Sequence, residues 1–98
     1  LLSDETIMNA TRVASSGENV WHEPGPYPAW GNGFMLPISE HFAMPGGNGF
    51  GHNGLGGQAG WASLDARLGF GYTTSYLRSD ADTQKHQQDL VKALQKLI

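Results

Sequence analysis

The chain has 98 residues, and its six Lys and Arg against nine Asp and Glu give a net charge of −3. A chain of this length folds as one small domain, which excludes a two-lobed enzyme. The six basic residues are scattered from Arg12 to Lys96 and form no stripe that could follow a phosphate backbone, so we expect no nucleic acid partner. The longest apolar run is far shorter than the roughly 20 residues of a bilayer span, so we expect no membrane partner.

The absence of cysteine excludes a disulfide framework, a thiolate zinc site and a Cys nucleophile. The chain begins Leu1-Leu2 without a basic stretch followed by an apolar one, which predicts no signal peptide. We interpret it as a segment excised from a longer protein. Glycine, with 14 residues, is about twice as frequent as in average proteins, and eight of the glycines lie within residues 46–60.

The N-terminal residues have the pattern of a short helix over residues 4–15. Ser3 is a suitable N-cap, and two acidic residues follow it in the first turn, where negative charge interacts favourably with the helix dipole. Apolar residues then recur at helical spacing until the polar residues before Gly17 interrupt them. The helix is short, so we expect it to need a partner surface.

A proline-rich loop is predicted over residues 17–30. Prolines on alternate positions from Pro24 to Pro28 exclude both a helix and a central strand there. The apolar residues that follow predict a short strand over residues 33–36, which ends before Pro37.

Three further strands are predicted over residues 50–54, 59–65 and 68–77, with a tight turn between the last two. In the last strand, large side chains such as Phe70 alternate with small ones such as Gly71. One side of this strand is therefore nearly bare, and another element can pack close to its backbone there.

The C-terminal residues 81–98 predict a helix, which Ser79 or Asp80 could cap. Its apolar positions form one stripe: Leu90, Val91, Leu94, Leu97 and Ile98. The polar side has no basic excess, which favours core packing over a membrane or partner surface. We expect this helix to pack on the bare side of the preceding strand. The prediction is a single α+β segment, residues 1–98, in which an antiparallel sheet of three to four strands carries the two helices.

Two patterns that suggest cofactor or metal binding fail on their context. Residues 49–54 match G-x-G-x-x-G, but a strand pattern follows them where a dinucleotide-binding unit needs a helix, and no Walker A sequence is present. His22 and His41 each stand next to a glutamate, and adjacent side chains seldom point the same way. A metal site is open only if the fold collects His22, His41 and His52. We predict no metal and no cofactor.

His52 and Asn53 are the chemically versatile residues of the glycine-rich stretch. Small neighbours leave room for a substrate beside them, as in a strand that forms a pocket wall. The alternative is a histidine on a glycine-rich turn with no functional role. The residues alone favour neither interpretation.

At this stretch the chain resembles the C-terminal part of serine β-lactamase-like proteins, which include class C β-lactamases, DD-peptidases and related esterases. His52-Asn53-Gly54 stands where that family has Lys/His-Thr/Ser-Gly on an inner strand of the active site. Gly56-Gly57 stands at the family's glycine pair, and two strands and a C-terminal helix follow in order. The resemblance extends back through residues 30–34 to the first helix, so it covers nearly the whole chain and implies a fragment of the β-lactamase/transpeptidase-like fold.

The resemblance implies acyl transfer, in which the Ser of Ser-x-x-Lys is the nucleophile. This chain has no Ser-x-x-Lys and no Tyr-x-Asn/Ser, so we expect the nucleophile upstream of Leu1. By resemblance His52 takes the place of the basic motif residue, to assist proton transfer or bind a substrate carboxylate. The implied substrate-binding residues are Asn53, Gly54, Gly56 and Gly57. Asn53 departs from the usual hydroxyl residue.

The expected function is therefore one wall of the active site of a serine hydrolase that acts on an ester or amide. The expected partner is the remainder of the parent catalytic domain, and the segment alone is expected to be inactive. Because excision exposes a sheet surface, the isolated segment is also expected to self-associate. The alternative is a small non-catalytic binding or structural domain with a glycine-rich partner-binding turn.

Overall fold

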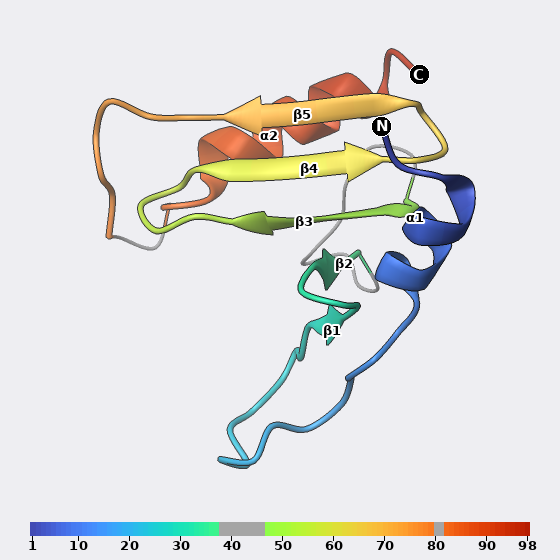
Figure 1. The fold of residues 1–98 in the computed structure, drawn as a ribbon. Helices are drawn as coiled ribbons and strands as arrows, with labels where there is room; N and C mark the ends of the chain where they lie inside the picture. The colour runs from blue at the N-terminus through green and yellow to red at the C-terminus, as the bar shows by residue number, and fades with distance from the viewer. Residues whose placement is uncertain (38–46, 80–81) are drawn as a thin grey trace.

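The computed structural model describes residues 1–37, 47–79 and 82–98, and within them the chain has an α+β fold (Figure 1). The two helices are α1 (Asp4–Thr11) and α2 (Lys85–Gln95). One antiparallel sheet has the order β1-β2-β3-β4-β5, with strands β1 (Ala29–Trp30), β2 (Met35–Leu36), β3 (Gly49–Asn53), β4 (Ala59–Ser63) and β5 (Leu68–Tyr72). The predicted α+β class and antiparallel sheet are confirmed, with five strands among the described residues where three to four were expected. That this sheet is a fragment of a β-lactamase-like fold stays a prediction.

Helix α1 begins as predicted and ends earlier. The Ser3 hydroxyl accepts a hydrogen bond from the Thr6 amide, which is the expected N-cap. The helix ends at Thr11 instead of residue 15 because the next residues turn toward the sheet. Ser15 forms an isolated antiparallel bridge with Trp30, and this pairing requires extended backbone.

Strand β1 lies inside the segment that was predicted to be a loop. Ala29 and Trp30 pair with Leu36 and Met35 at one edge of the sheet, directly after Pro28. The prolines from Pro24 to Pro28 all precede the strand, so their missing N–H groups remove no hydrogen bond from its two-residue ladder. Strand β2 is shorter than the predicted 33–36 because a tight turn precedes it.

Strands β3, β4 and β5 form a regular meander in the predicted order. Each has five residues, and the ladder runs without interruption from Ala59 paired with Tyr72 to Ser63 paired with Leu68. Strand β5 ends at Tyr72 instead of residue 77, because β4 offers no partner beyond Ala59. The alternation of large and small residues continues beyond Tyr72, but the strand ends where its pairing with β4 ends.

The two sides of this meander are covered differently. The helix side, as we call it, carries residues with a common orientation in the ladder: Asn53, Ala59, Trp61, Ser63 and Phe70. The open side carries their alternates: Phe50, His52, Gly60, Ala62, Gly69 and Gly71. The core of Met35, Ala59 and Trp61 lies on the helix side.

Helix α2 packs on the helix side, behind β4 and β5 in Figure 1, where its buried Gln87 reaches Asn53. The expectation that it would cover the bare side of β5 is wrong. A Cβ atom built on Gly69 or Gly71 would have none of the described atoms within 4 Å. The apolar area of Trp61 and Phe70 explains the choice, since a helix buries more surface against large side chains than against glycine.

Helix α2 begins at Lys85 instead of residue 81 and ends at Gln95 instead of residue 98. Gln84 occupies the N-cap position without a capping side-chain hydrogen bond, so Ser79 does not cap the helix, and Asp80 lies outside the described residues. Residues 82–84 form a turn that precedes the helix. Within the expected apolar stripe, Val91 is buried, whereas Leu97 is 82% exposed because the helix has ended.

Candidate functional site

His52 lies on β3, the middle strand of the five, with its side chain exposed on the open side of the sheet. Its ladder partner is Gly60, which in turn pairs with Gly71. A Cβ built on either glycine would meet none of the described atoms within 4 Å. The imidazole therefore lies beside the backbone of Gly60 and Gly71, which no described residue covers. A substrate or another protein segment has room to approach there.

Two contacts orient the imidazole ring. The ring of Trp30 lies with its centroid 5.4 Å from that of His52, at an interplanar angle of 33°. The Nδ1 atom of His52 contacts the backbone carbonyl oxygen of Asn53. A carbonyl oxygen only accepts hydrogen bonds, so this contact places a hydrogen on Nδ1. In the neutral ring, Nε2 is then left with its lone pair and can accept a proton.

Asn53 follows His52 directly, and its side chain lies on the opposite side of the sheet. Its Oδ1 accepts one hydrogen bond from the Trp61 indole Nε1 and one from Gln87 Nε2, each at 3.1 Å. Two donors fill both acceptor positions of an amide oxygen. Its predicted substrate-binding role stays a prediction, and a substrate could use only the Nδ2 group of this side chain.

Gly54, Gly56 and Gly57 form the turn between β3 and β4. Gly56 and Gly57 are buried and have φ angles of +83° and +105°. A Cβ on Gly57 would lie 2.5 Å from the Thr83 carbonyl oxygen, and one on Gly56 would overlap the Leu77 side chain. The absence of side chains at Gly56 and Gly57 thus leaves room for Leu77 and Thr83, which lie between β5 and α2 in the sequence. Substrate binding by these three glycines stays a prediction.

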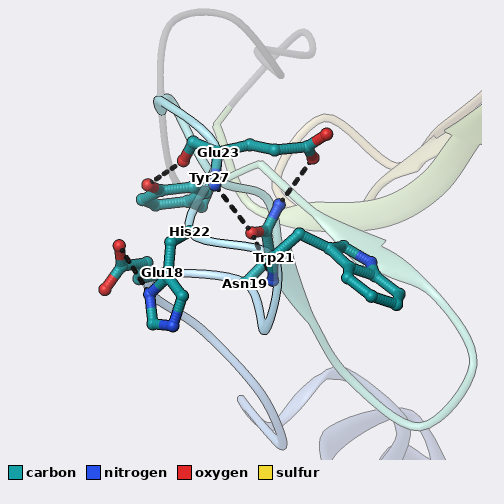
Figure 2. Close-up of polar contacts among 6 residues, drawn as sticks. All are labelled: Glu18, Asn19, Trp21, His22, Glu23 and Tyr27. Atoms are coloured by element: carbon teal, nitrogen blue, oxygen red, sulfur yellow. Dashed lines mark hydrogen bonds and ion pairs between the residues drawn. The ribbon is translucent and has the colours of Figure 1, made fainter.

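A cluster of polar contacts braces the loop that precedes β1 (Figure 2). The Asn19 side chain accepts hydrogen bonds from the amides of Trp21 and Glu23 and donates one to the Glu23 carboxylate. The Tyr27 hydroxyl donates to the Glu23 carbonyl oxygen. Trp21 is nevertheless 77% exposed. Asparagine commonly bonds to the backbone two residues on, which is the signal in the sequence that predicts such a turn.

The histidines of the predicted open metal site are not brought together. His22 lies in the loop before β1, where its Nδ1 is 3.2 Å from a Glu18 carboxylate oxygen (Figure 2), and His41 lies outside the described residues. Within residues 1–37, 47–79 and 82–98, no three His, Asp or Glu side chains form a group that could hold a metal ion.

Sequence reasoning identified His52 and Asn53 but missed Trp61 and Gln87 as the partners of Asn53. A signal for Trp61 was present, because a buried indole N–H needs an acceptor and Asn53 lies across a short hairpin from it. A signal for Gln87 was also present, because it lies three, four and seven residues before Leu90, Val91 and Leu94 and so shares their face of the helix.

Among the described residues, no helix is both long and apolar enough to cross a membrane. No protein family, curated protein sequence or solved structure matches this chain.

Proposed function

We propose that this chain is the C-terminal part of a β-lactamase-like serine hydrolase and contributes one wall of its acyl-transfer site. The observation that supports the proposal is the position of His52. Its imidazole is exposed on the central strand, beside Gly60 and Gly71 on the open side of the sheet. A proton acceptor at the edge of an accessible surface is what general base or acid catalysis requires. The sequence resemblance at His52-Asn53-Gly54 specifies the reaction class.

In the proposed reaction, a serine oxygen from the remainder of the parent domain attacks the carbonyl carbon of an ester or amide. The alcohol or amine leaves with a proton, and water then releases the acid from the acyl-enzyme. His52 assists through Nε2, because Nδ1 is engaged with the Asn53 carbonyl oxygen. This chemistry needs no metal and no cofactor.

The open side of the sheet supports the second half of the proposal, that the remainder of the parent domain is the partner. Three glycines there leave backbone uncovered by any described residue, while the other side already carries α2. In the isolated chain, a second copy is expected to cover this surface instead. Light scattering at rising concentration measures this, and a monomer at every concentration would contradict the self-association.

The test of function uses the gene-encoded chain that contains these 98 residues. We expect a Ser-x-x-Lys sequence before Leu1, and labelling of that serine by a fluorophosphonate probe. Replacement His52→Ala should lower kcat/KM for a p-nitrophenyl ester by about 100-fold, the usual contribution of one general acid or base. The isolated chain should neither bind the probe nor cleave the ester.

The matched control is His86→Ala, which removes an exposed imidazole from α2. Its kcat/KM should equal that of the unmodified protein. Equal losses in the two variants, or the absence of a reactive serine, would contradict the hydrolase proposal. An acyl-enzyme burst from the isolated chain would contradict its expected inactivity.

The alternative function, a binding domain with a partner-binding glycine turn, has less support. Gly56 and Gly57 of that turn are buried against Leu77 and Thr83 of the same chain, so an external partner that binds these two glycines would have to displace those residues.

A further inference from the structure

We infer that Asn53 is a positioning residue, which fastens helix α2 to the strand that carries His52 and thereby sets the orientation of the imidazole. The inference concerns three elements that meet at one atom: the Asn53 Oδ1 of β3, the Trp61 indole of β4 and the Gln87 amide of α2. Only its meaning for catalysis rests on the proposed function.

The donor and acceptor properties of the three groups determine which atom of each side-chain amide is the oxygen and which is the nitrogen. An indole Nε1–H only donates, so the Asn53 atom that faces it must be the amide oxygen. The Gln87 atom that faces the same oxygen must then be a donor, its Nε2. The orientation of both amides follows from the tryptophan alone.

The two groups that donate to Asn53 Oδ1 are buried, so each needs this acceptor. Trp61 is 5% exposed and Gln87 is 4% exposed, so water does not replace Asn53 as their partner. A buried donor without an acceptor is costly, and loss of the Asn53 oxygen would leave two such donors at once. Gln87 is also the buried polar residue of α2, which makes Asn53 its specific attachment to the sheet.

The junction also accounts for an amide at position 53, where the resembling family has a hydroxyl. The amide oxygen stands one bond further from the backbone than a Ser or Thr hydroxyl. This extra reach lets one oxygen serve both a neighbouring strand and a helix on the next layer. A hydroxyl at this place would be closer to β3 and further from Gln87.

The coupling to His52 runs through one peptide unit. His52 and Asn53 are adjacent, point to opposite sides of β3, and are linked again by the contact of His52 Nδ1 with the Asn53 carbonyl oxygen. A rotation of the Asn53 backbone therefore moves the carbonyl that holds the imidazole. The helix thus acts on His52 without touching it.

The experiment is nuclear magnetic resonance on the 98-residue chain, labelled with ¹⁵N. We expect Asn53→Ala to accelerate hydrogen exchange of the Trp61 indole N–H at least tenfold and to shift the His52 ring ¹⁵N resonances. The indole of Trp21 and the ring of His22 should not change. Asn53→Asp keeps an acceptor oxygen and should restore slow exchange of the Trp61 indole.

Asn48→Ala is the matched control, because Asn48 precedes the same strand and its side-chain amide donates to the exposed turn residue Asp65. It should leave the Trp61 exchange and the His52 resonances unchanged. If Asn53→Ala does not fold, Gln87→Met removes one donor at similar volume and should still shift the His52 ring resonances.

Unchanged His52 resonances in Gln87→Met, or unchanged Trp61 exchange in a folded Asn53→Ala variant, would overturn the inference. Neither measurement uses catalytic activity. The positioning role can therefore fail while the hydrolase proposal stands, and it can hold if no reactive serine exists.

Discussion

The two sides of the β3–β4–β5 meander use glycine for opposite reasons. On the helix side, a Cβ on Gly51 would lie closer than 3.0 Å to the backbone of Gly60 and Trp61. On the open side, a Cβ on Gly60 would meet none of the described atoms within 4 Å. One glycine is required by a packed interior, and the other leaves a surface uncovered.

The difference shows that glycine content alone does not indicate flexibility or a ligand site. The helix side is held by the Trp61 core and by the Asn53 junction, whereas the open side combines bare backbone with the exposed His52. The residues that stabilise the fold therefore lie on one side of the sheet, and His52, which has the proposed catalytic role, lies on the other side. Substitutions on the two sides should have different consequences.

The largest effect should come from the glycine comparison itself. Gly51→Ala forces a methyl group against backbone atoms and should lower the free energy of unfolding by about 3 kcal/mol. The matched variant Gly60→Ala should change it by less than about 1 kcal/mol, with a gain expected because alanine costs less backbone entropy. Urea unfolding of both variants measures the contrast, and equal losses would refute the distinction between the two sides.

A smaller effect is expected from the helix that covers one side. Val91 is 5% exposed, and Val91→Ala removes two buried methyl groups, which should cost about 2 kcal/mol of unfolding free energy. Leu90 is the adjacent control at 44% exposure, and Leu90→Ala should cost about half as much or less. Thermal or urea unfolding distinguishes them. A larger loss of unfolding free energy in Leu90→Ala than in Val91→Ala would show that Leu90, and not Val91, faces the sheet.

The smallest effect concerns an exposed ion pair on α2, where Lys85 Nζ lies 2.5 Å from an Asp89 carboxylate oxygen. The hydrogen bond from Lys85 lowers the pKa of Asp89, and the hydrogen bond to Asp89 raises the pKa of Lys85. The Asp89 contribution to stability is therefore present above its ordinary pKa and is lost as the pH falls through the lowered value. The Lys85 contribution is lost as the pH rises through the raised value.

Asp89→Asn removes this pair and should lower the melting temperature slightly at neutral pH and low salt. The difference from the unmodified chain should vanish in strong acid and shrink in high salt, because the pair is solvent-exposed and screened. A difference that persists in strong acid would show that Asp89 acts by some means other than its charge.

Local pattern predicted the elements whose cause is local. Ser3 caps α1 because a serine before a helical pattern satisfies an exposed amide wherever the helix packs. The tight turn expected between residues 59–65 and 68–77 predicted the pairing of β4 and β5, and residues 50–54 closely match the observed β3. His52 was singled out as a candidate because it is a titratable side chain among glycines, and the family resemblance gave it a role that stays a prediction.

The ends and faces of these elements depended on distant partners. Helix α1 stops at Thr11 because Ser15 pairs with Trp30, and β1 exists because β2 offers an unpaired edge. Trp30 lies fifteen residues after Ser15, outside a local window of sequence. Strands β1 and β2 form a short local hairpin, which the prolines before β1 concealed. The side chosen by α2 likewise depended on the combined apolar area of two strands.

By itself the sequence therefore determined the α+β class and the order of the described elements other than β1, and it singled out His52 as a candidate residue. These properties follow from periodicity, capping and composition, which act over a few residues. Only the tertiary structure decided that α2 lies against Trp61 and that the Asn53 oxygen joins three elements. That junction requires residues 53, 61 and 87 to meet, and only the packing of helix on sheet brings them together.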